Sequence, residues 1–216
     1  MTKASFAGWP PARPFMVVLS GPSGVGKTVL CRHLLEQDPR LVRSISATTR
    51  SPRGHEQDGV DYYFWSEPQF RSEIDRGHFL ESAVVHGHLY GTPRAPLETA
   101  LSAGRFPLLD VDVQGGRSVK ALVPDAVLIL VSPPSRAALE SRLRGRMTDA
   151  ESSIEERLAA ASHELREGEH YDYLVINDVL EDAVRDAATI IAAERLRRER
   201  QPYLLNFVRE LVARPN

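Results

Sequence analysis

The chain has 216 residues, of which 42% are hydrophobic and 26% charged, the composition of an ordinary globular protein. Its 27 basic and 29 acidic residues give a formal net charge of −2, which argues against a general nucleic-acid binder. The single cysteine allows no internal disulfide, and no apolar run approaches the ~20 residues that a bilayer requires. We therefore expect a cytoplasmic protein with no membrane partner, preceded by a flexible, proline-rich arm over residues 1–14 that lacks the features of a secretory signal.

The first motif lies between a predicted buried strand at residues 15–19 and a predicted helix at 27–37. Residues 21–28 match the phosphate-loop pattern G-x-x-x-x-G-K-[ST]. The glycines let backbone N–H groups face a polyphosphate, Lys27 adds a charge for the outer phosphates, and Thr28 offers a hydroxyl to Mg²⁺. The sequence therefore predicts a nucleoside triphosphate site made of Gly21, Pro22, Ser23, Gly24, Val25, Gly26, Lys27 and Thr28.

The rest of the chain alternates predicted strands with predicted helices. The strands are expected at 108–111, 127–131 and 174–176, and the helices at 96–103, 114–122, 135–144, from about 151, and from about 180 to 200. This alternation predicts an α/β fold with a central parallel sheet flanked by helices. Ligands bind at the carboxyl ends of such strands, where the phosphate loop, Asp110 and Asp112 fall. Near the end, we expect Arg195, Arg197, Arg198 and Arg200 to form a solvated, salt-bridged helix face.

Two segments depart from this alternation. Residues 46–93 contain short alternating runs, which predict an inserted, mostly antiparallel sub-domain with one helix near 68–76. Residues 144–157 are polar and end in a new helix start, where Thr148 and Glu151 could form a capping box, so we interpret them as a mobile helical lid. The remaining core would consist of residues 15–45, 94–143 and 158–216.

The inserted segment carries several motifs in order. It reads S-A-T-T-R-S-P-R at 46–53, G-V-D-Y-Y-F at 59–64, F-L-E at 79–81 and Y-G-T at 90–92. In these motifs the chain closely resembles the guanylate kinase family, and the likeness continues through L-D-V-D-V-Q-G at 109–115, R-L-R-G-R at 142–146 and V-I-N-D at 175–178. It covers about residues 15–200. The resemblance implies a phosphate-loop kinase fold and reversible phosphoryl transfer from MgATP to GMP or dGMP.

The resemblance also implies roles for particular residues on the acceptor side. Two arginines three positions apart can grip a phosphate from two sides, and tyrosine hydroxyls can donate to its other oxygens. By resemblance this clamp is Arg50, Arg53, Tyr62 and Tyr90. A carboxylate can accept from both N1–H and N2–H₂ of guanine, which adenine lacks. By resemblance the base pocket is Glu81 with Ser46, Thr92 and Asp112.

On the donor side, the resemblance places Mg²⁺ at Thr28 and Asp110 and sets Asn177 near the donor base. Arginines of the lid would close over the triphosphate, with Arg142 also near the adenine. The residues expected to act on the transferred group are Lys27, Arg50, Arg146 and Arg157.

Two departures from the family pattern concern loops. Met147 follows the lid arginine where the family often has glycine, and the usual R-x-G-E is R-G-H-E at 53–56. Two other functions stay open: a related sugar-phosphate kinase, for example one acting on ribose 1,5-bisphosphate, and a non-catalytic protein-interaction module. The first should lack the guanine-reading set, and the second should lack Lys27 and Thr28. The sequence does not predict an oligomeric state.

Overall fold

The computed structural model describes residues 12–85, 87–144, 151–201 and 203–213. Its centre is a five-stranded sheet in the order β2-β7-β1-β8-β9, in which every pairing between neighbouring strands is parallel. The strands are β1 (Val17–Ser20), β2 (Leu41–Arg43), β7 (Phe106–Asp110), β8 (Val127–Ser132) and β9 (Tyr173–Ile176). The predicted α/β class is confirmed, although β2 was not predicted.

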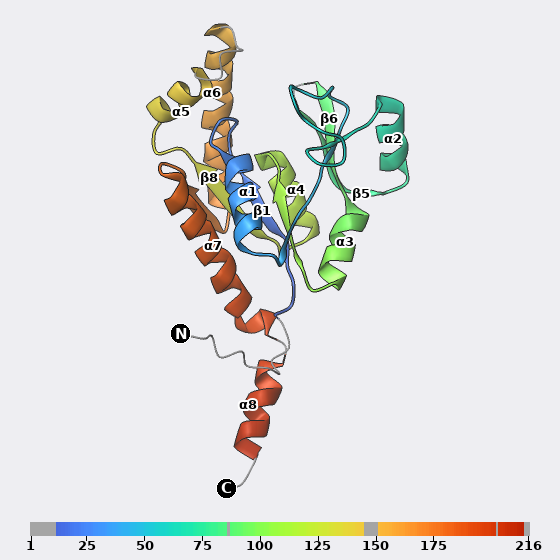
Figure 1. Ribbon diagram of the computed structural model, residues 1–216, viewed down its shortest axis with the longest axis vertical. Helices are drawn as coiled ribbons and strands as arrows, with labels where there is room; N and C mark the ends of the chain where they lie inside the picture. The colour runs from blue at the N-terminus through green and yellow to red at the C-terminus, as the bar shows by residue number, and fades with distance from the viewer. Residues whose placement is uncertain (1–11, 86, 145–150, 202, 214–216) are drawn as a thin grey trace.

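Alternating side chains of the central strands bury both faces of this sheet. Val17 and Leu19 pack with helices α1 (Lys27–Gln37) and α7 (Leu180–Leu196), which lie side by side in Figure 1. Val18 packs on the other face with α3 (Arg94–Ser102) and α4 (Val113–Leu122). A strand that is covered on both faces reads as a continuous apolar run, which is why β1, β7 and β8 could be found from the sequence.

The segment predicted as an insertion forms a second, four-stranded sheet in the order β4-β3-β6-β5. Two of its three pairings are antiparallel, and β3 pairs with β4 in parallel. Helix α2 (Glu67–Asp75) is preceded by Ser66, whose hydroxyl caps it by accepting from the Gln69 N–H. Phe70 of this helix stacks on Phe79 with ring centroids 4.5 Å apart. The strands are β3 (Ala47–Thr48), β4 (Tyr63–Phe64), β5 (Phe79–Val85) and β6 (His88–Pro93).

Helices α5 (Arg136–Arg144) and α6 (Glu151–Arg166) rise beyond the central sheet on the side opposite β5 and β6 (Figure 1). The predicted lid therefore spans the end of α5 and the start of α6. Its middle, residues 145–150 with Arg146, Met147 and Thr148, lies outside the described residues, as do residues 1–11 of the predicted arm. The η1 turn (Glu167–His170) connects α6 to β9.

The C-terminal region differs from its prediction. Helix α7 ends at Leu196, and a short η2 turn (Arg198–Arg200) leads to helix α8 (Leu204–Ala213), which was not predicted. Figure 1 shows α8 extending away from the sheets. Among the helices that the structure describes, none combines the length and the apolar character that crossing a bilayer requires.

The expected solvated arginine face is wrong for two of its four members. Arg195 and Arg200 are only 7% and 4% exposed, whereas Arg197 and Arg198 do face solvent. The planar guanidinium of Arg200 lies 3.8 Å above the ring of Phe15 and pairs with Glu194 at 3.1 Å. Arg195 likewise lies over an aromatic ring, that of Phe106, and pairs with Asp38. Ring contacts and carboxylates offset part of the cost of burying these charges, although Nε and one terminal nitrogen of Arg195 have no hydrogen-bond partner among the described residues.

Candidate active site

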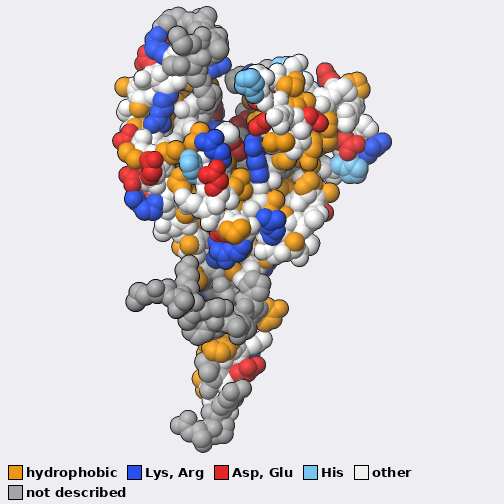
Figure 2. Space-filling view, viewed as in Figure 1, with side chains coloured by type: hydrophobic (Ala, Val, Ile, Leu, Met, Phe, Trp, Pro, Cys, Tyr) orange, Lys and Arg blue, Asp and Glu red, His pale blue; other side chains and the backbone are white. Residues whose placement is uncertain are grey.

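A cavity of about 340 Å³ opens at the carboxyl end of the central sheet. Figure 2 shows the molecule hollowed between the side that carries α6 and the side that carries β5 and β6. Most of the predicted site residues line it: Gly21, Pro22, Ser23, Gly24, Gly26, Lys27, Thr28, Ser46, Tyr62, Glu81, Tyr90, Asp110 and Asp112. Residues distant in sequence are therefore brought to one place.

The phosphate loop wraps one end of this cavity. Gly21 and Gly26 have φ of 141° and 93°, a region that side chains rarely adopt, and a Cβ at Gly21 would collide with the carbonyl oxygen of Val131. The residue that caps α1 is Gly26, which has no side chain to accept a hydrogen bond from the N–H groups of the first turn, so these groups can donate to a ligand. The Lys27 ammonium donates to the carbonyls of Gly21 at 2.5 Å and Pro22 at 3.3 Å. The arrangement suits an anion.

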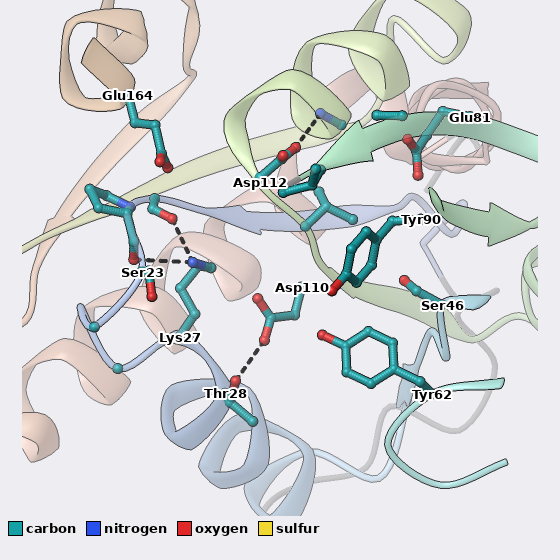
Figure 3. Close-up of a pocket in the computed structure, with 18 of the residues that line it drawn as sticks. Ser23, Lys27, Thr28, Ser46, Tyr62, Glu81, Tyr90, Asp110, Asp112 and Glu164 are labelled. Carbon is teal, nitrogen blue, oxygen red and sulfur yellow. Dashed lines mark hydrogen bonds between the residues drawn. The ribbon is translucent and has the colours of Figure 1, made fainter. Parts of the chain in front are cut away.

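Two oxygen groups lie together on the cavity floor. The Thr28 hydroxyl is 3.0 Å from Oδ2 of Asp110, which ends strand β7 (Figure 3). A hydroxyl and a carboxylate beside a phosphate site are the kind of oxygen ligands that Mg²⁺ prefers. The residues present therefore fit the predicted metal site.

The opposite end of the cavity holds Glu81, which lies across the pocket from Lys27 in Figure 3. Glu81 on β5 pairs in register with Thr92 on β6, whose hydroxyl donates to Oε1 of Glu81 at 2.5 Å. Burial raises the pKa of the Glu81 carboxyl; the Thr92 hydrogen bond opposes this shift, and nearby Asp112 adds to it. Asp112 itself caps α4 by accepting from the backbone N–H of Gly115 at 2.8 Å.

Beside the cavity, but not among the residues that line it, lies an arginine held by several partners. Arg50 is 7% exposed, its Nε donates to the Tyr90 hydroxyl at 3.0 Å, and both of its terminal nitrogens pair with Glu56 at 2.9 Å. The hydroxyls of Tyr62 and Tyr90 point toward Asp110 (Figure 3). Burial, with a contribution from the Asp110 charge, raises the pKa of Tyr62 to about 12, so its hydroxyl stays protonated and can donate.

Several predicted residues do not line the cavity in this structure. Asn177 is buried beneath the phosphate loop and donates to the carbonyl of Val25 at 2.7 Å. Arg142 donates weakly to the Asp178 carbonyl at 3.4 Å. Arg53 is exposed on its loop. Thr92 is fully buried behind Glu81, Arg157 is partly exposed on α6, and Arg146 lies outside the described residues.

Glu164, whose side chain enters the cavity from α6, was not predicted from the sequence (Figure 3). Burial raises the pKa of its carboxyl, and the charge of Lys27 opposes that shift. Glu164 follows Arg157 by seven residues, two helical turns, so both lie on one face of α6. That spacing was the signal that could have identified it.

A phosphate loop between the first strand and first helix of a parallel sheet, an acidic residue at a neighbouring strand end and a second sheet facing the loop define the class of phosphate-loop kinases. The family model described as guanylate kinase matches residues 13–194. Because this match covers most of the chain, the chain belongs to the guanylate kinase family and is an enzyme, a nucleoside monophosphate kinase.

Similar proteins and structures agree with that assignment. The chain is 48% identical over 186 residues to a guanylate kinase of Myxococcus xanthus, covering 86% of this chain and 89% of the relative. It is 51% identical over 184 residues to one of Anaeromyxobacter dehalogenans, covering 84% and 81%. The crystal structure of guanylate kinase from Anaplasma phagocytophilum superposes with a TM-score of 0.78 at 31% identity, covering 94% of this chain and 98% of that chain.

Proposed function

We propose that this chain catalyses reversible transfer of the γ-phosphoryl group of MgATP to GMP or dGMP, giving ADP and GDP. The observation that carries the proposal is a half-buried carboxylate, Glu81, held by Thr92 at the end of the cavity opposite the Lys27 ammonium. One end suits a polyphosphate and the other suits a base with hydrogen-bond donors. A cavity with these two ends can set two nucleotides with their phosphates facing each other.

On the donor side, the backbone N–H groups of residues 21–28 would surround the β-phosphate, and Lys27 would leave the loop carbonyls for the outer phosphate oxygens. Thr28 and Asp110 would hold Mg²⁺, which when bound neutralises charge on the triphosphate oxygens. Asp110 would also keep the Thr28 hydroxyl turned toward the cavity.

On the acceptor side, Arg50, Tyr62 and Tyr90 would hold the phosphate of GMP, with Arg53 joining from its loop. Glu56 keeps the Arg50 guanidinium fixed before any anion arrives, so little side-chain entropy remains to be lost on binding. Positioning of this kind accounts for much of the rate when the enzyme itself forms no bond to the phosphoryl group.

The guanine base would lie among Glu81, Ser46 and Asp112, with Thr92 behind Glu81 as the partner of its carboxylate. An ionised Glu81 accepts from N1–H and N2–H₂ together, while adenine would leave it facing a bare acceptor. Because Thr92 donates to one carboxylate oxygen, it holds the group in the orientation that this contact needs.

Closure over the two nucleotides would be the work of residues 144–157, the proposed lid, against the core and the 46–93 insertion. Arg142, Arg146 and Arg157 would approach the phosphates and stabilise the charge on the transferred group. Excluding water in this way would also prevent hydrolysis of ATP.

Neither alternative function is favoured. A non-catalytic interaction module would not need Lys27 and Thr28, which both line the cavity. A kinase for a sugar phosphate would not need a half-buried carboxylate, Glu81, at the base end.

The test is an ADP-release assay with ATP and a panel of acceptors: GMP, dGMP, AMP, UMP and ribose 1,5-bisphosphate. We expect kcat/KM for GMP to exceed that for AMP by roughly four orders of magnitude, as in sites that discriminate through substrate hydrogen bonds. Equal use of AMP, or preference for the sugar bisphosphate, would contradict the proposal.

A further inference from the structure

We propose that Asn177 is a positioning residue for the phosphate loop, which aims the N–H of Gly26 at the donor phosphates by holding the peptide between Val25 and Gly26. The proposal rests on the donor site proposed above. It differs from the sequence expectation, in which Asn177 lies near the donor base.

The first observation is that the side-chain amide of Asn177 donates its hydrogen bond to the phosphate loop. Asn177 follows strand β9, and its own N–H donates to the Ser132 carbonyl at 2.8 Å, which fixes it at the carboxyl end of the sheet. Its side chain is 6% exposed, and Nδ2 donates to the carbonyl oxygen of Val25 at 2.7 Å. This contact joins residues 152 positions apart in sequence, inside the protein and beneath the loop.

The second observation concerns the geometry of one peptide unit. A peptide is planar and trans, so its C=O and N–H point in opposite directions. When the Val25 carbonyl points down to Asn177, the N–H of Gly26 on the same peptide must point the other way. Gly26 lines the cavity, whereas Val25 is fully buried. The N–H of Gly26 therefore points into the cavity, toward the space where the phosphates would lie.

The third observation is the close approach of the two residues. A Cβ at Gly26 would lie 2.5 Å from Nδ2 of Asn177, and Gly26 has a φ of 93°. Asn177 therefore fills the space beside Gly26 as well as bonding to the carbonyl before it. Without the amide, this peptide could rotate and present a carbonyl oxygen to the phosphates, which would repel them.

Inorganic tripolyphosphate carries the phosphates of ATP without the base. Measuring its binding therefore distinguishes a role of Asn177 in positioning the phosphate loop from a role in contacting adenine. Calorimetry would compare ATP, inorganic tripolyphosphate and GMP on wild type, Asn177→Ala, Asn177→Asp and a control, Asn206→Ala, in which the substituted residue is exposed on α8. We expect Asn177→Ala to weaken ATP and tripolyphosphate by the same factor, about tenfold or more, while GMP binding is unchanged. Asn177→Asp should be weaker still, because it cannot donate to a carbonyl and adds a negative charge beneath the anion.

Loss of ATP affinity with unchanged tripolyphosphate affinity would show a base contact and overturn the proposal, as would unchanged affinity for both. Wild-type tripolyphosphate binding without GMP phosphorylation would refute the proposed function yet leave this inference standing. Should the variants fail to fold, a crystal structure of the wild type with a non-hydrolysable ATP analogue decides. We expect Nδ2 of Asn177 still on the Val25 carbonyl, and an amide turned to adenine would contradict us.

Discussion

The two ends of the cavity are built in different ways. The donor end is one continuous loop whose backbone is fixed by glycines, by α1 and by Asn177 below it. The acceptor end is assembled from side chains on separate strands and loops, with Glu81 on β5, Thr92 on β6 and Arg50 after β3. Backbone donors need only a loop geometry, whereas side-chain recognition needs several elements folded together.

This difference indicates which end of the cavity binds phosphates and which end selects the base. The loop can hold the phosphates of a triphosphate whatever base it carries, because backbone N–H groups contact only the anion. By our proposal the acceptor end distinguishes bases, because a half-buried carboxylate that lacks its partner is costly. Variants at the two ends should therefore fail in different ways.

The largest effect is expected for Lys27→Ala. Loss of the cation at the outer phosphates should lower kcat by about 10²–10³-fold, the range for removing one group that stabilises transition-state charge. GMP affinity should be unchanged in calorimetry. Arg71→Ala, which removes an exposed ion pair with Glu67, serves as the control and should retain activity. A Lys27→Ala enzyme with near-normal turnover would disprove the donor assignment.

The variant Arg50→Lys tests the acceptor end of the cavity. Lysine keeps the charge but loses the fork that contacts Glu56 and Tyr90, so KM for GMP should rise about 10–100-fold while KM for ATP stays constant. The matched control, Arg76→Lys, changes an exposed arginine of the same segment. If KM for ATP rose instead, the two ends would not be separate.

The variant Glu81→Gln should reduce the preference of the enzyme for GMP over AMP as the phosphoryl acceptor. The amide cannot accept from both donors of guanine, so KM for GMP should rise roughly 10–100-fold and the preference over AMP should narrow. Exposed Glu98→Gln is the control. Steady-state kinetics with both acceptors give the ratio, and an unchanged ratio would remove Glu81 from the base pocket.

Although Glu81→Gln should weaken the use of GMP, it should slightly raise the thermal stability of the protein. Burial raises the pKa of Glu81, so the folded state favours its protonated form and ionisation destabilises the protein. That penalty is absent below the unfolded carboxyl pKa, near 4.3, grows as pH rises through the raised folded pKa, and is full above it. Glu81→Gln should therefore have a higher Tm than wild type at neutral pH, with a difference that shrinks as pH falls. A Tm difference independent of pH would contradict this.

The sequence allowed prediction of the core strands and the phosphate loop, because these are local patterns in continuous segments. It did not predict β2, a three-residue strand too short to show a pattern, or the end of α7 at Leu196. Arg195 and Arg200 were misjudged because their burial depends on Phe106 and Phe15, which lie far away in sequence.

The same limit applies within the candidate site. The grouping of Glu81 with Thr92 came from a family resemblance, and only the strand register explains their contact. Glu164 and the contact of Asn177 with Val25 both depend on tertiary packing that no local pattern records.

The most direct test of the two-ended cavity is a crystal structure of the protein with GMP and a non-hydrolysable ATP analogue bound together. We predict the guanine N1–H and N2–H₂ on the Glu81 carboxylate, the GMP phosphate on Arg50, Tyr62 and Tyr90, and the triphosphate in the loop at residues 21–28. A guanine bound away from Glu81, or a GMP phosphate seated in the loop, would contradict the account.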